Sequence, residues 1–219
     1  MIHYKAIAID GPAAAGKSTI AQQVAQLLGY VYIDTGAMYR AVTYTTLKHQ
    51  IDTQDEASIM KLLDNMTITL TPDKKVLVNG EDITEAIRQP NVSQNVSVVA
   101  AHKLVRDELK RRQIDYANID NVVMDGRDIA TNVLPEAEFK IFMTASVAVR
   151  AKRRYDENIR RGIESDLKTL EAEIAHRDQL DSTREHSPLL KAQDAIEIDT
   201  SNMSIEEVVK RITEIVKAG

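Results

Sequence analysis

A phosphate-binding motif near the N-terminus limits what this chain can fold into. Residues 11–18 read GPAAAGKS, which matches the pattern G-x-x-x-x-G-K-[ST]. An apolar run over residues 5–10 precedes the motif, and a helical pattern over residues 19–28 follows it and ends at Gly29. A strand, a glycine loop and a helix in this order direct backbone N–H groups and a helix N-terminus at an anion. The sequence therefore predicts a nucleotide-phosphate site at the end of a buried parallel strand, rather than an ordinary turn.

Two side chains of the motif have chemistry that phosphoryl transfer needs. Lys17 can reach the β- and γ-phosphates of ATP, and the hydroxyl of Ser18 can bind Mg²⁺. The predicted ATP-binding residues of this segment are Gly11, Pro12, Ala13, Ala14, Ala15, Gly16, Lys17, Ser18 and Thr19.

Composition restricts the class of protein. With 219 residues and 43% apolar residues, the chain is long and apolar enough for one α/β domain with a sizeable core. A net charge of −5 argues against a dedicated nucleic-acid binder, and the absence of cysteine excludes thiolate chemistry. Asp10 interrupts the N-terminal apolar run, and no stretch is long enough for a membrane span. We therefore expect a cytoplasmic protein, a monomer, without nucleic-acid or membrane partners.

Strand and helix patterns alternate along most of the chain. Further strands are predicted at residues 31–33, 121–125, 139–143 and 195–199, with helices between them. This alternation predicts an α/β protein with a five-stranded parallel sheet and helices on both faces, the three-layer fold of P-loop NTPases. Residues 67–83 instead alternate with period two around Asn79-Gly80, which predicts a small antiparallel insertion.

Three further helix features are predicted. Residues 52–66 are expected to form a short amphipathic helix, Ser146 to cap the helix after the strand at 139–143, and Ser204 and Glu207 to form the capping box of the last helix.

Arginines at the ends of predicted elements favour a small-molecule kinase among the proteins that carry such loops. The guanine-reading pattern Asn-Lys-x-Asp of GTPases is absent. A kinase needs a second pocket, which is lined with arginines if the acceptor is itself a phosphate. Arg177, Asp181 and Arg184 have the spacing i, i+4, i+7, which would place them on one face of a helix. A row of surface ion pairs is the alternative interpretation of this segment.

A basic segment follows the fourth predicted strand. Residues 150–161 hold six arginines and lysines against two acidic residues, and Gly162 ends the segment. This pattern is typical either of a solvated basic helix or of a mobile lid that folds over ATP phosphates.

Four motifs together resemble the bacterial cytidylate kinases. They are residues 11–18, residues 34–40 (DTGAMYR), residues 125–128 (DGRD) and the spaced set RDxxDxxR over residues 177–184. The resemblance covers nearly the whole chain, including residues 67–83. It implies the reaction MgATP + CMP or dCMP → ADP + CDP or dCDP. It also implies a core (1–60, 91–149 and 167–219), a nucleotide-monophosphate-binding insertion (about 61–90) and a lid (about 150–166).

The resemblance also implies which residues form the site. The match at Thr35 is inexact, because serine is common there, but a hydroxyl is kept. Asp125 is inferred to hold a water on Mg²⁺. The implied acceptor residues are Thr35, Arg40, Ser97, Arg106, Arg127, Asp128, Arg177, Asp181 and Arg184. The implied catalytic residues are Lys17, Arg127 and Arg177. The lid residues implied to face ATP are Arg150, Arg153 and Arg154.

Reading of the cytosine base makes a specific demand on the backbone. Asp128 can accept from N4 of cytosine and Arg106 can donate to N3 or O2, with Ser97 as a helper. Ser97 and Arg106 are nine residues apart, which is about 180° of rotation on an unbroken helix. If both contact the base, the helix must break near residues 101–103.

The remaining alternatives for the function are a kinase for another small acceptor, such as UMP or shikimate, and a nucleotide-dependent regulator.

Overall fold

The computed structural model describes residues 4–218 and divides into two compact units. One unit comprises Met1–Tyr32 and Asn121–Gly219, and the other comprises Ile33–Asp120. The predicted insertion (about 61–90) lies inside the second unit, and the predicted lid (about 150–166) lies inside the first. Residues 1–3 and 219, which end the predicted core, lie outside the described residues.

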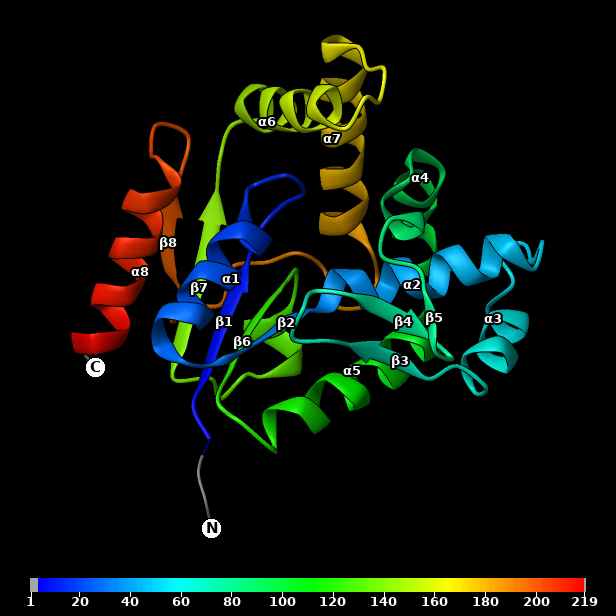
Figure 1. Ribbon diagram of the computed structural model, residues 1–219, viewed down its shortest axis with the longest axis horizontal. Helices are drawn as coiled ribbons and strands as arrows, with labels where there is room; N and C mark the ends of the chain where they lie inside the picture. The colour runs from blue at the N-terminus through cyan, green and yellow to red at the C-terminus, as the bar shows by residue number, and fades with distance from the viewer. Residues whose placement is uncertain (1–3, 219) are drawn as a thin grey trace. The chain divides into compact units, whose positions relative to one another are not determined.

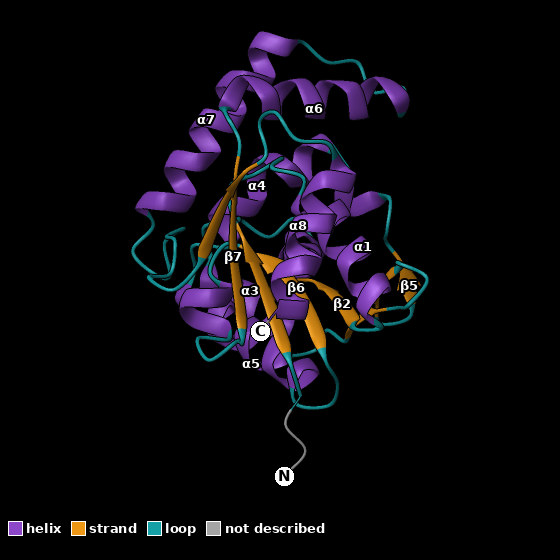
Figure 2. Ribbon diagram, turned by 90° about the vertical axis from the view of Figure 1, so that its left-hand side faces the viewer, coloured by secondary structure: helices purple, strands orange, loops and turns teal. Residues whose placement is uncertain are grey.

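A parallel sheet organises the first unit (Figures 1 and 2). Central strand β1 (Ala6–Asp10) pairs in parallel with β6 (Val122–Gly126) and β7 (Phe139–Thr144), and β7 pairs in parallel with β8 (Ile196–Asp199). The five-stranded sheet predicted from the alternating pattern is thus confirmed. Its order is β2 (Val31–Asp34), β6, β1, β7 and β8.

Helices α1 (Lys17–Leu28) and α8 (Ile205–Ala218) pack their apolar stripes onto this sheet. Buried side chains such as Val24 and Ile212 meet Ile9 of β1 in one core cluster. As predicted, α1 ends at Gly29 in the left-handed conformation, with φ 68°. The predicted capping box of α8 also forms, because Ser204 Oγ accepts from the backbone N–H of Glu207 and Glu207 Oε2 accepts from that of Ser204.

The remaining helices of the first unit are η2 (Ile129–Val133), α6 (Val147–Arg160) and α7 (Leu167–Thr183). Ser146 caps α6 as predicted, and α6 packs against α7. Figure 1 shows α6 following directly from the carboxyl end of β7.

Helices surround a small antiparallel sheet in the second unit. Strands β3 (Ile68–Leu70), β4 (Val76–Val78) and β5 (Glu81–Asp82) form the predicted meander. Asn79 and Gly80 both have positive φ in the turn between β4 and β5, as the sequence predicts. The helices are α2 (Thr35–Lys48), α3 (Glu56–Leu63), η1 (Ala86–Arg88), α4 (Pro90–Val99) and α5 (Lys103–Ala117).

The predicted break between Ser97 and Arg106 is present. Helix α4 ends at Val99 and α5 begins at Lys103, and His102 between them is extended, with φ −66° and ψ 126°. Helix α3 is shorter than the predicted helix over residues 52–66, because Asp55 caps it by accepting from Ser58 N–H.

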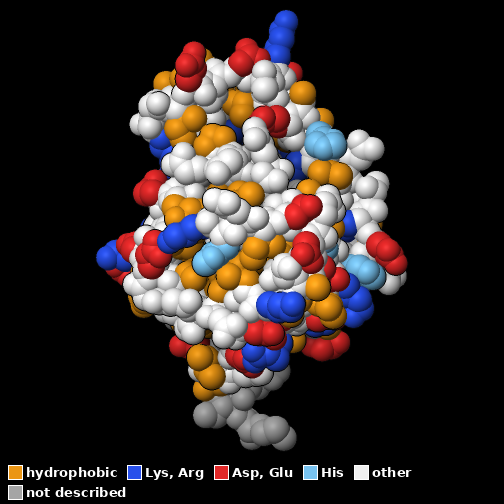
Figure 3. Space-filling view, turned by 90° about the vertical axis from the view of Figure 1, so that its right-hand side faces the viewer, with side chains coloured by type: hydrophobic (Ala, Val, Ile, Leu, Met, Phe, Trp, Pro, Cys, Tyr) orange, Lys and Arg blue, Asp and Glu red, His pale blue; other side chains and the backbone are white. Residues whose placement is uncertain are grey.

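Charges of both signs are interleaved on the face drawn in Figure 3. Exposed ion pairs such as Lys48–Glu81 (2.8 Å) and Lys103–Asp107 (2.5 Å) illustrate the same mixing and each contribute little to stability. Among the helices that the structure describes, none is both long enough and apolar enough to cross a membrane.

Candidate active site

The phosphate loop joins β1 to α1 in the predicted arrangement. Gly11 has φ 151°, and a Cβ atom there would lie 2.1 Å from the carbonyl oxygen of Met143, so a side chain cannot be accommodated. Gly16 has φ 89° and caps α1, which leaves the first N–H groups of this helix directed at the loop. The two glycines of the motif are therefore required by the backbone.

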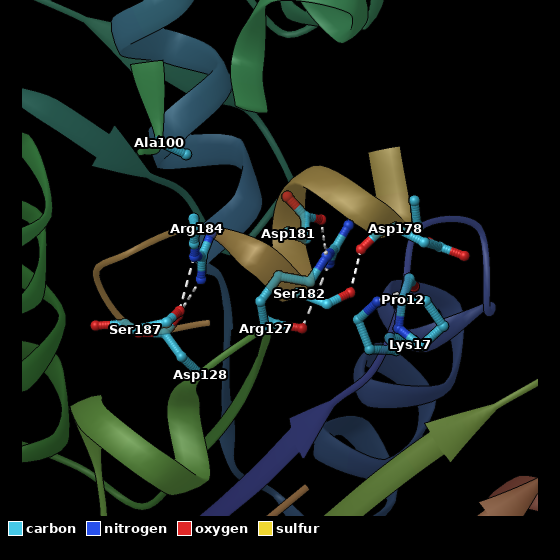
Figure 4. A network of polar contacts seen from close by, with 12 residues as sticks. Pro12, Lys17, Ala100, Arg127, Asp128, Asp178, Asp181, Ser182, Arg184 and Ser187 are labelled. Atoms are coloured by element: carbon cyan, nitrogen blue, oxygen red, sulfur yellow. Dashed lines mark hydrogen bonds and ion pairs between the residues drawn. The ribbon is translucent and has the colours of Figure 1, made fainter. Parts of the chain in front are cut away.

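Lys17 lies buried at the start of α1, with 5% of its surface exposed. Its ammonium donates to the carbonyl oxygen of Pro12 at 2.7 Å (Figure 4). Burial lowers the pKa of Lys17 well below its ordinary value, and Arg127 adds to this effect, whereas the Asp125 and Asp10 carboxylates oppose it. The negative charge of phosphate oxygens would stabilise the buried Lys17 ammonium.

Ser18, Asp125 and Tyr32 form a chain of hydrogen bonds beside the loop. Ser18 Oγ donates to Asp125 Oδ2 at 2.8 Å, and Tyr32 Oη donates to Asp125 Oδ1 at 2.8 Å. Because the Ser18 hydroxyl donates its hydrogen bond to Asp125, the lone pairs of its oxygen remain available to a metal ion. A serine hydroxyl backed by a buried carboxylate is a hard oxygen donor set, and it fits Mg²⁺.

A second charged cluster joins the end of β6 to the end of α7 (Figure 4). Arg127 Nε donates to Asp181 Oδ2 at 2.9 Å, and Arg184 lies 3.5 Å from Asp128 Oδ1. Burial alone would raise the pKa of Asp181, but Arg127, Arg177 and Arg184 hold this pKa below its ordinary value. Asp181 is therefore ionised, and three guanidinium groups surround it.

Arg184, the last residue of the predicted helical face, is the C-cap of α7, and its N–H still donates to the carbonyl oxygen of Leu180. Helix α7 ends at Thr183, and Arg184 is extended, with ψ 144°. Arg184 Nε donates to the carbonyl oxygen of Ser187, and the same guanidinium lies beside Asp128. Asp128 also accepts from Asn132 Nδ2 at 2.9 Å, and it is 4% exposed.

The three arginines predicted for the lid have different surroundings. Arg150 is 4% exposed, donates to the carbonyl oxygen of Ala13, and makes two hydrogen bonds to Asp178 of α7 (3.0 and 2.5 Å). Arg153 donates to the hydroxyl and the carbonyl oxygen of Thr200 and, at 3.3 Å, to the carbonyl oxygen of Ala15. Arg154 lies 4.0 Å from Glu157. Arg150 thus ties α6 and α7 to the phosphate loop.

A pocket of about 680 Å³ opens beside the loop, between α6 and the segment after β8. Apolar residues such as Ile20 and Val208 line it together with arginines of α6. The lining residues are Ala14, Ala15, Gly16, Thr19, Ile20, Met143, Arg153, Arg154, Asp156, Glu157, Arg160, Arg161, Thr200, Met203, Ser204, Ile205 and Val208.

In the second unit, Thr35 and Arg40 lie in the first turns of α2. Asp34 caps this helix by accepting from Ala37 N–H at 2.7 Å, and its other oxygen binds Arg40 at 2.9 Å. Thr35 is 2% exposed. The buried Nε of Arg40 has no hydrogen-bond partner among the described residues, so this guanidinium keeps donor capacity for an anion.

Ser97 and Arg106 lie on either side of the break between α4 and α5. Both are buried, and Arg106 donates to the carbonyl oxygen of Ala100 at 3.0 Å. The guanidinium of Arg106 lies 5.4 Å from the centre of the Tyr39 ring, which orients its plane.

Three residues beside these groups were not predicted from the sequence. They are Asp10, Tyr32 and Asp178, and each makes its contact with a distant part of the chain. Two signals were available, because Asp10 is a strand-end carboxylate directly before the glycine loop and Asp178 is a fixed position of the RDxxDxxR set.

The phosphate loop and the five-stranded parallel sheet define a P-loop fold, and solved structures share this fold. A shikimate kinase from Bacteroides thetaiotaomicron aligns with a TM-score of 0.51 at 15% identity, over 97% of this chain and 98% of that one. An uncharacterized protein from Eubacterium ventriosum also aligns with a TM-score of 0.51, at 13% identity and over 99% of both chains. At these identities the likeness concerns the fold alone.

Comparison of sequences defines the family within this class. The cytidylate kinase family model matches residues 7–218. A cytidylate kinase from Bacillus cereus is 56% identical over 213 residues, covering 96% of this chain and 95% of that protein. A cytidylate kinase from Geobacillus thermodenitrificans is 58% identical over the same shares. The chain belongs to the cytidylate kinase family.

Proposed function

We propose that this protein transfers the γ-phosphoryl group of ATP to CMP or dCMP, giving CDP or dCDP. Membership of the cytidylate kinase family over residues 7–218 is the observation that carries this conclusion. The site adds chemical support, because a phosphate loop and an arginine cluster lie in the same unit. From the sequence we further propose a cytoplasmic monomer.

The phosphate loop is the proposed donor site. Backbone N–H groups of residues 11–18 and the N-terminus of α1 would bind the β- and γ-phosphates. The Lys17 ammonium would stabilise charge on the transferring group, and Ser18, backed by Asp125, would bind Mg²⁺. The metal would neutralise developing charge on the phosphate oxygens. The ATP nucleoside is proposed to enter the 680 Å³ pocket.

The contacts of the lid arginines suggest different roles. Arg153 and Arg154 line the pocket and are proposed to contact ATP. Arg150 is already bound to Asp178 and to the loop carbonyl of Ala13. We therefore propose that Arg150 stabilises the conformation of the phosphate loop through the carbonyl oxygen of Ala13.

The arginine cluster is the proposed acceptor site of the first unit. Arg127, Arg177 and Arg184 would bind the acceptor phosphate, and the ionised Asp181 would accept from sugar hydroxyls. The predicted base contact of Asp128 remains part of the proposal. Acceptor contacts of the second unit are proposed for Thr35, Arg40, Ser97 and Arg106.

The proposed reaction needs no general base. The acceptor oxygen belongs to a phosphate monoester that is mostly dianionic at pH 7, because its second pKa is about 6. The residues must instead bring two anions together, align them and exclude water. Lys17 and the arginines supply the positive charge for this task.

Detection of the product tests the proposal directly. Wild-type protein is incubated with MgATP and CMP, and ADP and CDP are separated by chromatography. We expect equal amounts of the two products. The Lys17→Met variant is the control, because it should stay folded and lose turnover by orders of magnitude. ADP formation without CDP, or CDP formation that Lys17→Met does not reduce, would refute the proposal.

A further inference from the structure

Asp10 is a buried carboxylate to which the proposed reaction assigns no role. It is the last residue of β1 and is 1% exposed. Its Oδ1 accepts from the backbone N–H of Ile129 at 2.9 Å, and its Oδ2 accepts from that of Ala130 at 2.7 Å. These N–H groups belong to the first two residues of η2. Both carboxylate oxygens therefore hold the start of this short helix.

The position of Asp10 connects two functional segments. The next residue, Gly11, begins the phosphate loop, and in the β1–β6 ladder Asp10 lies level with Gly126. On the other side of the contact, Ile129 directly follows Arg127 and Asp128. One side chain thus ties the start of the donor loop to the segment that carries two proposed acceptor residues.

This arrangement has an energetic cost. The pKa of Asp10 is raised from 3.8 to about 6, chiefly by burial and in part by the nearby Asp128 carboxylate, while the two N–H bonds and Lys17 lower it. A buried carboxylate destabilises a folded protein unless its partners compensate fully. A neutral amide would avoid this electrostatic cost but could accept from only one of the two N–H groups, so the carboxylate is the side chain that holds both.

We infer that Asp10 is a positioning residue for phosphoryl transfer: its carboxylate fixes residues 127–128 relative to the phosphate loop. The inference rests on the proposed function. Transfer requires the acceptor oxygen to lie in line with the γ-phosphoryl group, and a misplacement of about 1 Å costs on the order of 100-fold in rate. Two hydrogen bonds to consecutive N–H groups hold the acceptor segment more firmly than one would.

The Asp10→Asn variant tests this role with little change of shape. The amide oxygen can accept from one N–H, but the amide NH₂ then faces the other N–H and cannot accept. We expect kcat with CMP to fall about 10- to 100-fold and KM for CMP to rise, while KM for ATP changes less than about 2-fold. The midpoint of thermal unfolding at pH 8 should stay the same or rise.

Two control variants separate positioning from general stability. Val209→Ala truncates a core residue of α8 and should lower the unfolding midpoint with kcat kept. Asp55→Asn changes a carboxylate cap in the other unit and should leave both quantities unchanged. Unchanged kcat in Asp10→Asn would overturn the inference, as would equal losses of kcat, both KM values and thermal midpoint, or failure to obtain folded protein. Lack of CDP formation by the wild-type protein would instead refute the proposed function.

Discussion

The hydroxyl of Tyr32 is bound to Asp125, which in turn accepts from Ser18. Residues that orient metal ligands commonly change metal affinity about 10-fold or more when they are lost. We therefore expect Tyr32→Phe to weaken ADP binding about 10-fold in the presence of Mg²⁺ and to leave metal-free ADP binding unchanged. Calorimetric titrations with Mg²⁺ and with a chelator measure both affinities.

Tyr30→Phe is the matched control for this experiment. It removes a hydroxyl two residues earlier on the chain, outside the hydrogen bonds to Asp125. An equal loss of affinity with and without Mg²⁺ in Tyr32→Phe would show that Tyr32 supports the loop rather than the metal ligands.

Asp128 is the proposed reader of the cytosine amino group. An amide in its place can turn its NH₂ toward O4 of uracil, so Asp128→Asn should lose CMP activity and narrow the CMP/UMP ratio of kcat/KM. The surrounding contacts offer a competing result, because Asp128 also lies 3.5 Å from Arg184. If kcat/KM falls equally for both substrates, Asp128 acts through Arg184 and does not read the base. Asp194→Asn is the control, because it changes an exposed carboxylate that pairs with Lys140.

Side chains inside the glycine motif could be predicted, because the motif fixes their backbone within eight residues. Lys17 and Ser18 lie where the pattern places them. The partners of the site could not be predicted in this way. Tyr32 contacts a residue 93 positions away, and Asp10 binds N–H groups 119 and 120 positions away. Such contacts depend on the strand order, which local patterns do not contain.

Among the elements, α6 is the one predicted to change on binding. Its arginines line the pocket, and Arg150 anchors its first turn to α7. We expect the amides of residues 150–161 to exchange faster in the free protein than with ATP and CMP both bound. Hydrogen exchange with mass spectrometry measures this, with α8 as the internal control. Equal protection of residues 150–161 in both states would contradict a lid.

Capping residues predicted element ends well, and helical periodicity predicted them less well. Gly29, Ser146 and Ser204 stand where the sequence placed them. Periodicity extended α3 back to Asp52, but Asp52 accepts from Gln54 N–H in a turn before the true cap. No glycine or proline in residues 100–102 signals the break before α5. The break was predicted only because Ser97 and Arg106 were both expected to contact one base, which an unbroken helix does not allow.

The alternation of strands and helices along the chain predicted the parallel sheet.

The pH dependence of the protein's stability gives a further test. The pKa of Asp10 is about 6 in the native state against 3.8 ordinarily, so the native state binds this proton more tightly. The contribution is stabilising below about pH 4 and is lost as pH rises through 6. Lys17 and Asp128, which face this carboxylate, modify the shift in opposite directions.

Asp10→Asn removes this titration and leaves the other groups in place. The free energy of unfolding of the variant, relative to the wild type, should therefore increase between pH 5 and pH 7.5, by on the order of 1 kcal/mol. Urea unfolding at both pH values measures the difference. Parallel changes in the two proteins would contradict a raised pKa at Asp10.

The acceptor specificity of the intact protein tests the account most directly. A coupled assay of ADP formation compares kcat/KM for CMP, dCMP, UMP, AMP and shikimate at fixed MgATP. Family membership and the arginine cluster predict high values for CMP and dCMP, with UMP and AMP far lower and shikimate inactive. A preference for UMP or shikimate, or ATP hydrolysis that no acceptor stimulates, would contradict the proposed cytidylate kinase activity.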